Sequence, residues 1–258
     1  MAPTSAVKLL LSTCSAMLGL LAAVPANADP VTFAQVKEHA VNGSGDINLD
    51  WVVADGVGQL VTHSAFDLVD FTFESYTGML PAALMGVQSA KLTIAATTTA
   101  HAFLSSGYDF QPFDHSLTLT FTRATPVILF GKSLSNLLTV TIMPDLADET
   151  SLSGRKGAHS MVLSADSGTE VVTYTSDFID FSHTIERDLA LSFSSVNPGL
   201  SIASGFLSPF RTDFTGTFDS DPAPVVFEIP EPGSLLILAA GFGGIAMALR
   251  RRRSAQPT

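Results

Sequence analysis

The side chains of this chain that could do chemistry are mostly carboxylates. The densest group, Asp145, Asp148 and Glu149, lies just after a run of alternating apolar residues. Calcium binds six to eight oxygens from carboxylates and loop carbonyls, so this loop is a weak candidate for a structural calcium ion. Because it contains no D-x-D-x-D-G run, the alternative is that these are solvated loop charges. We expect no other metal or cofactor.

Two further pairs of aspartates bracket two apolar residues each. They are Asp177 with Asp180, and Asp67 with Asp70. Glycoside hydrolysis needs two carboxyl groups at a set separation. With 24 acidic residues in the chain, some pair will always meet that condition. The pairs therefore do not support an enzyme, and a secreted polysaccharide hydrolase stays only a second alternative.

Nucleophilic and transition-metal chemistry has no local motif. The exported part contains no G-x-S-x-G elbow, and its histidines show neither H-x-H nor H-E-x-x-H spacing. The single cysteine, Cys14, lies in a segment that we predict to be removed, so the mature domain has no disulfide, thiolate or zinc–cysteine site. The histidines are His39, His63, His101, His115, His159 and His183.

Sugar-binding proteins usually present exposed aromatic rings. This chain has one tryptophan, Trp51, and three tyrosines, of which only Tyr108 follows a Ser-Ser-Gly turn where exposure is expected. A carbohydrate-binding or adhesion module is therefore the first alternative function. Outward threonines such as Thr118, Thr120 and Thr122 form rows that differ between strands, so we interpret them as ordinary strand surface rather than an ice-binding face.

The elements that must position these side chains are β-strands. Apolar and polar residues alternate, with many β-branched and aromatic side chains, which predicts half-buried strands with one face in water. We therefore predict an all-β fold, an antiparallel β-sandwich of jelly-roll-like type. The strongest candidates are 116–122, 138–142, 189–193 and 214–218; weaker ones are 51–54, 58–62, 68–73, 92–94, 127–130, 160–163 and 171–175.

Three segments are predicted to break the strand pattern. Residues 33–40 are the only plausible short helix. Ser153-Gly154-Arg155-Lys156-Gly157 has the composition of a turn. The Asp219–Pro224 segment, with two prolines, is predicted to be a linker after the last strand.

Net charge excludes nucleic acid as a partner. The chain carries −11 overall. Without Lys8 and Arg250–Arg253, 8 basic residues remain against 24 acidic ones, which makes the net charge −16. Phosphate neutralisation needs a basic patch, whereas strong acidity favours solubility outside the cell.

The N-terminal 28 residues have the pattern of a secretory signal peptide. Lys8 supplies the positive charge, an apolar stretch follows, and Ala26-Asn27-Ala28 forms an A-x-A cleavage site.

Three segments with different physical properties follow one another at the C-terminus. Pro230-Glu231-Pro232 is predicted to be stiff and extended, because proline fixes φ and biases the preceding residue toward extended conformations. Residues 235–249 are an uncharged apolar run, and Arg250–Arg253 form a cationic membrane stop. Fifteen helical residues span only about 23 Å of the ~30 Å hydrocarbon core, so we predict one short transmembrane helix that holds the protein temporarily.

These three parts resemble the PEP-CTERM sorting signal of Gram-negative bacteria, also labelled an ice-binding protein C-terminal domain; that label says nothing about ice here. The resemblance implies export, recognition by an exosortase and association with exopolysaccharide producers. The expected organisation is a signal peptide (1–28), an exported domain (29–224), a linker (225–229) and the sorting signal (230–253).

Together these features predict a non-enzymatic structural or interaction domain. Its predicted partners are the secretion machinery, an exosortase and extracellular polysaccharide, with the membrane contacted through the C-terminal helix. It passes through the inner membrane transiently and then resides in the envelope or outside the cell.

Cleavage after Ala28 is the first prediction. The A-x-A pattern specifies this bond, so N-terminal sequencing of the exported protein should begin at Asp29. A different first residue, or a fatty acyl group on Cys14, would contradict the assignment.

Overall fold

The computed structural model describes residues 30–39, 49–64, 68–74, 80–129, 131–144, 150–166 and 170–227. Within these ranges the chain forms strands and one 3-10 turn, η1 (Ala82–Leu84). The strands are β1 (Val31–Glu38), β2 (Leu49–Ala54), β3 (Val57–Thr62), β4 (Leu68–Phe73), β5 (Gln88–Thr98), β6 (Phe103–Ser105), β7 (Tyr108–Pro112), β8 (Leu117–Leu129), β9 (Lys132–Met143), β10 (Ser151–Arg155), β11 (Met161–Asp166), β12 (Val171–Thr175), β13 (Ile179–Asp180), β14 (Glu186–Asn197), β15 (Ile202–Ala203), β16 (Phe206–Leu207), β17 (Phe210–Asp221) and β18 (Val225–Val226).

Fourteen of these strands form one antiparallel sheet. Twelve follow one another in the order β12-β9-β8-β5-β3-β2-β17-β14-β11-β10-β7-β6, and β1 and β4 lie off this path. The long strands β5 and β17 each pair with two strands along one edge. β3 and β4 share the edge of β5, and β1 and β2 share that of β17. Since β1 also pairs with β4, and β2 with β3, two separate bridges join β5 to β17.

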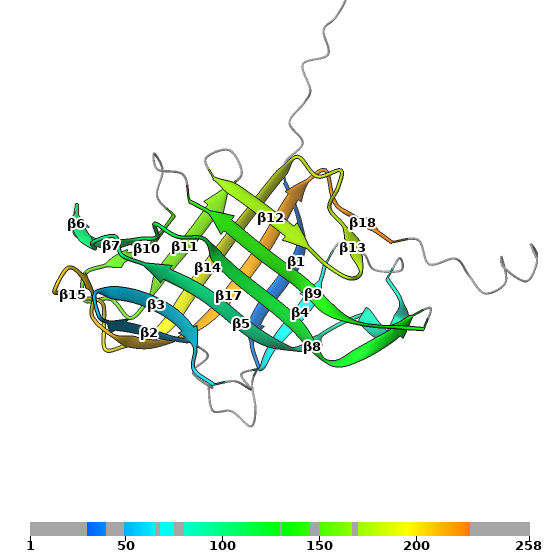
Figure 1. Ribbon diagram of the computed structural model, residues 1–258, viewed down its shortest axis with the longest axis horizontal. Coiled ribbons are helices and arrows are strands. Elements are labelled where there is room, and N and C mark those ends of the chain that lie inside the picture. The colour runs from blue at the N-terminus through cyan, green and yellow to red at the C-terminus, as the bar shows by residue number, and fades with distance from the viewer. Residues whose placement is uncertain are drawn as a thin grey trace, which may run out of the picture.

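The sheet folds over itself into two layers (Figure 1). Strands β12, β9, β8 and β5 lie in front and cross β1, β17, β14 and β11 behind them. Aromatic rings fill the space between the layers. The ring centroid of Phe121 in β8 lies 5.5 Å from that of Phe218 in β17, and Phe71 of β4 contacts both, at 5.4 and 6.5 Å. All three side chains are fully buried.

The predicted all-β antiparallel fold is confirmed. The strongly alternating segments lie within β8, β9, β14 and β17, and the weaker ones mark strands as well. The segments 116–122 and 127–130 were predicted as separate strands, but β8 runs through both and turns into β9 at Gly131, whose φ is 73°. The predicted signal peptide and transmembrane helix lie outside the described residues.

The helix predicted for residues 33–40 is wrong, because Val31–Glu38 is strand β1. Its register against β17 shifts between Thr32 and Ala34, as in a β-bulge. The shift lets the adjacent residues Phe33 and Ala34 both face the core. Two neighbouring buried positions interrupt the two-residue alternation of a strand. The segment was therefore predicted as a helix.

The turn predicted for 153–157 is also displaced, because Ser151–Arg155 is strand β10. Gly154 serves close packing there, since a Cβ at that position would lie 2.4 Å from Leu200 Cδ1. The Asp219–Pro224 segment is not a free linker either. β17 continues through Asp221, and Val225–Val226 then pair again as β18.

The packing between the layers predicts a large effect of one ring. Phe121→Ala should lower the free energy of unfolding by about 3–5 kcal/mol, because it removes a fully buried aromatic side chain and leaves a cavity. Urea unfolding followed by circular dichroism measures this. Ile128→Ala, on the same strand but 67% exposed, is the control and should change stability by less than about 1 kcal/mol. Equal losses in both variants would contradict the proposed core.

Candidate functional site

The described part of the chain ends in a short strand that is tied to the domain. Val226 of β18 pairs with Ile179 of β13, and Val225 pairs with Asp180. The backbone N–H of Phe227 then donates to the carbonyl oxygen of Phe178 at 3.2 Å. Residue 227 is therefore held against the surface of the domain.

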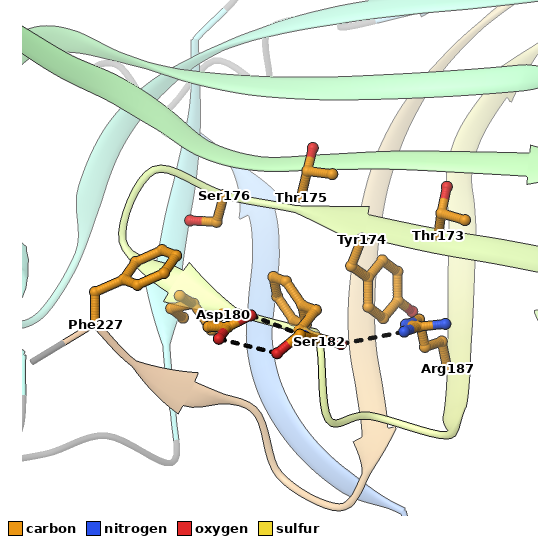
Figure 2. A pocket seen from close by; sticks show the side chains of 10 residues that line it. Thr173, Tyr174, Thr175, Ser176, Asp180, Ser182, Arg187 and Phe227 are labelled. Carbon is orange, nitrogen blue, oxygen red and sulfur yellow. Dashed lines mark hydrogen bonds between the residues drawn. The ribbon is translucent and has the colours of Figure 1, made fainter.

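A pocket of about 420 Å³ lies beside this strand (Figure 2). The aromatic rings of Phe181 and Phe227 and the side chain of Ile179 supply much of its apolar wall. Phe181 and Ile179 belong to the core, whereas Phe227 is 47% exposed. The pocket is lined by Thr173, Tyr174, Thr175, Ser176, Ile179, Asp180, Phe181, Ser182, Arg187 and Phe227.

One carboxylate lies at the rim of this pocket. Asp180 accepts hydrogen bonds from the backbone N–H of Ser182 at 2.8 Å and from its hydroxyl at 3.0 Å, as the dashed lines in Figure 2 show. The backbone bond is the main reason that the pKa of Asp180 is lower than its ordinary value of 3.8, and the hydroxyl lowers it further. Asp180 is therefore ionised at neutral pH, and the same lining includes the cationic side chain of Arg187.

Two other polar groups of the pocket hold its walls together. The hydroxyl of Tyr174 donates to the carbonyl oxygen of Asp188. Burial raises the pKa of this phenol well above its ordinary range, and the charges of Asp188 and Asp219 raise it further, so it stays neutral. Arg187 donates from Nη2 to the carbonyl oxygens of Phe181 and Thr184, at 3.2 and 3.0 Å, which closes the loop between β13 and β14.

The carboxylates of the predicted pair Asp177 and Asp180 bind different segments of the chain and do not form one site. Oδ2 of Asp177 accepts from the backbone N–H groups of Ser135 and Asn136, each at 2.8 Å, and so joins the start of β9 to the loop after β12. The side chain of Asp180 instead accepts hydrogen bonds from Ser182. Each carboxylate thus stabilises a turn of its own.

Histidine–aspartate pairs are a feature that sequence reasoning missed. Two of the three pairs join residues on different segments, with 31 and 13 positions between partners, so no local motif announces them. The pairs are His39–Asp70 (2.6 Å), His63–Asp50 (2.8 Å) and His115–Asp114 (2.7 Å).

The carboxyl of Asp114 has a strongly lowered pKa. Burial raises its pKa, but this is outweighed by hydrogen bonds from the hydroxyl and the backbone N–H of Thr99 and from His115, which hold the pKa well below its usual range. The carboxylate thereby ties the end of β5 to the segment between β7 and β8.

Most of the predicted site residues lie outside the described residues. Among the residues that the structure does describe, no group of three or more His, Cys, Asp or Glu side chains could hold a metal ion. The predictions that the structure does not reach concern Ala26 and Ala28, Asp145, Asp148 and Glu149, Pro230, Glu231 and Pro232, and Arg250, Arg251, Arg252 and Arg253.

An exposed aromatic group lies at the β6–β7 edge of the sheet. Tyr108 is 46% exposed, as its turn predicts, and Phe103 is 48% exposed. The rings of Phe103 and Phe110 stack with centroids 5.2 Å apart and planes 12° apart, and Tyr108 lies 6.5 Å from Phe110.

The threonine rows do match between strands, contrary to prediction. The register places Thr120 opposite both Thr93 and Thr139, and Thr139 opposite Thr175. A parallel row runs through Thr118, Thr141 and Thr173. Threonine is β-branched and favours strands, so these rows are explained by ordinary strand composition.

Residues 228–253 match the model of the PEP-CTERM protein-sorting motif. The C-terminus of this chain is a PEP-CTERM motif. It begins directly after Phe227, one of the residues that line the pocket. No curated protein and no solved structure matches the chain. The described residues contain no helix of the length and apolar character needed to cross a membrane, and the predicted helix of residues 235–249 lies beyond them.

The hydrogen bonds of Asp180 generate a pH prediction. Ser182→Ala should raise the pKa of Asp180 toward 3.8, though not fully, because the backbone bond remains. The lowered pKa means that ionised Asp180 stabilises the fold at neutral pH and that this contribution is lost as the pH falls through the folded pKa. NMR titration of the Asp180 carboxyl measures the shift. Ser182→Thr retains the hydroxyl and is the control; an unchanged pKa in Ser182→Ala would contradict the assigned cause.

Proposed function

We propose that this chain is an envelope or extracellular-matrix protein of a Gram-negative bacterium, with a non-enzymatic structural or interaction domain that is processed through its C-terminus. The PEP-CTERM motif implies export to the cell surface and recognition by an exosortase.

The observation that carries the proposal is the position of the motif. It starts one residue after the last backbone bond of the domain, Phe227 N–H to Phe178 carbonyl. The domain is thus the cargo that this motif delivers. An acidic cargo with a net charge of −16 between residues 29 and 232 suits an aqueous location outside the cell.

A non-enzymatic role is supported by how the carboxylates are used. Asp114, Asp177 and Asp180 accept hydrogen bonds from nearby backbone N–H groups and thereby stabilise loops. Carboxylates that hold loops in this way fit a scaffold or a binding partner.

A second candidate function, carbohydrate binding, is favoured by the exposed rings at the β6–β7 edge. Tyr108 and Phe103 offer faces on which sugar rings can stack. Binding on a glycan array that disappears in Tyr108→Ala and persists in Val162→Ala, a control of similar exposure, would favour this function.

The sorting function predicts distinct effects of two C-terminal variants. Replacing Pro230 and Pro232 by Ala frees φ and restores two N–H donors, so this segment can join the predicted helix behind it. Processing should then fail while export continues, and full-length protein should stay in the inner membrane. Fractionation with mass determination, in a host that carries an exosortase, measures both outcomes.

Replacing Arg250–Arg253 by Ser is the companion variant. It removes charges that each cost about 2.5–3.5 kcal/mol at a bilayer centre, so the short helix should slip outward and the precursor escape unprocessed. If the proline variant is trimmed and released like the wild type, the sorting proposal is wrong and the tail is only an anchor.

A further inference from the structure

The last described strand fixes how far the sorting motif can move from the domain. The final backbone bond is made by Phe227, and Pro230 follows three residues later. Three residues of fully extended chain span at most about 10 Å. A protein that grips Pro230-Glu231-Pro232 as an extended peptide must therefore lie against this end of the domain while β18 stays paired.

The surface at this end is suited to contact another protein. Val225 and Phe227 flank Val226, which packs against the core. Val225 is 51% and Phe227 47% exposed. Figure 2 shows Phe227 at one side of the pocket and the Asp180–Ser182 turn beside it.

The chemistry of the pocket specifies the complementary group. Its wall is apolar and aromatic, with Ile179, Phe181 and Phe227, and its rim carries the ionised carboxylate of Asp180. A volume of about 420 Å³ accommodates a large side chain from a partner. A partner that inserts an apolar side chain here and places a hydrogen-bond donor or a cation near Asp180 would match both features.

We propose that Val225, Phe227 and the rim of this pocket form a docking surface for the membrane protease that processes the sorting motif. The surface continues directly into the motif that this protease recognises, so one partner covers both. The inference rests on the proposed function and deepens it, because it assigns part of the recognition to the folded domain. Processing would then require a folded cargo with β18 paired to β13.

The first test compares two exposed phenylalanines in the full-length chain, in a host that carries the exosortase. Phe227→Ala should slow processing about tenfold, the size expected for an aromatic anchor at an interface. Phe103→Ala, at 48% exposure but at the opposite edge strand β6, should be processed at the wild-type rate. Equal rates for Phe227→Ala and wild type would overturn the proposal.

A second variant keeps every side chain and changes only the spacing. Six Gly-Ser residues inserted between Phe227 and Glu228 leave the motif intact but let it move away from the pocket. Processing should slow if the surface and the motif bind together, because the loss of effective concentration weakens the second contact. Unchanged or faster processing would contradict the docking surface.

A photo-crosslinking residue in place of Val225 identifies the occupant directly. A crosslink to the protease supports the proposal, whereas a crosslink to lipid, or none, overturns it. These results are separable from failure of the sorting proposal. If the Pro230 and Pro232 double variant blocks processing but the Phe227→Ala and spacer variants do not, only the docking surface is wrong.

Discussion

The structure depends on the contact between two layers of one sheet that fold over each other. The folded domain contains no cysteine, since Cys14 is the only one in the chain, so burial of aromatic and aliphatic side chains must hold the layers together. Phe121 of the front layer meets Phe218 of the back layer, and Phe71 packs against both. These rings belong to one continuous hydrophobic core, in which Tyr174 of β12 also meets Phe218 at 6.4 Å.

Those bridges determine where the chain can leave the domain. β1–β4 and β2–β3 both join β5 to β17. On its other edge β17 pairs with β14 from Arg211 to Asp221, so the chain leaves β17 at one end of the sheet. From there the chain turns back and pairs once more, as β18 on β13. The sorting motif begins two residues beyond this strand. The position at which the sorting motif begins is therefore fixed by the pairing of β18 with the folded domain.

The pocket lies at this junction between the core and the strand by which the chain leaves the domain. Its walls belong partly to the core, through Phe181 and Ile179, and partly to the exit strand, through Phe227. A domain that has not folded has neither the wall nor the exit point. Only folded copies therefore present the sorting motif next to a complete pocket.

The sequence by itself determined the strands with clear alternation, the absence of a disulfide, the acidic charge and the sorting motif. Alternation is a local signal, and Pro230-Glu231-Pro232, the apolar run and Arg250–Arg253 are contiguous, so both can be read without a fold. Only the tertiary structure decided that residues 31–38 are a strand, because a bulge hides the period, and that Val225–Val226 pair with a strand 45 residues earlier in the chain. The pocket and the His39–Asp70 pair likewise join distant segments, and no local pattern encodes a contact between residues that meet only when the layers close.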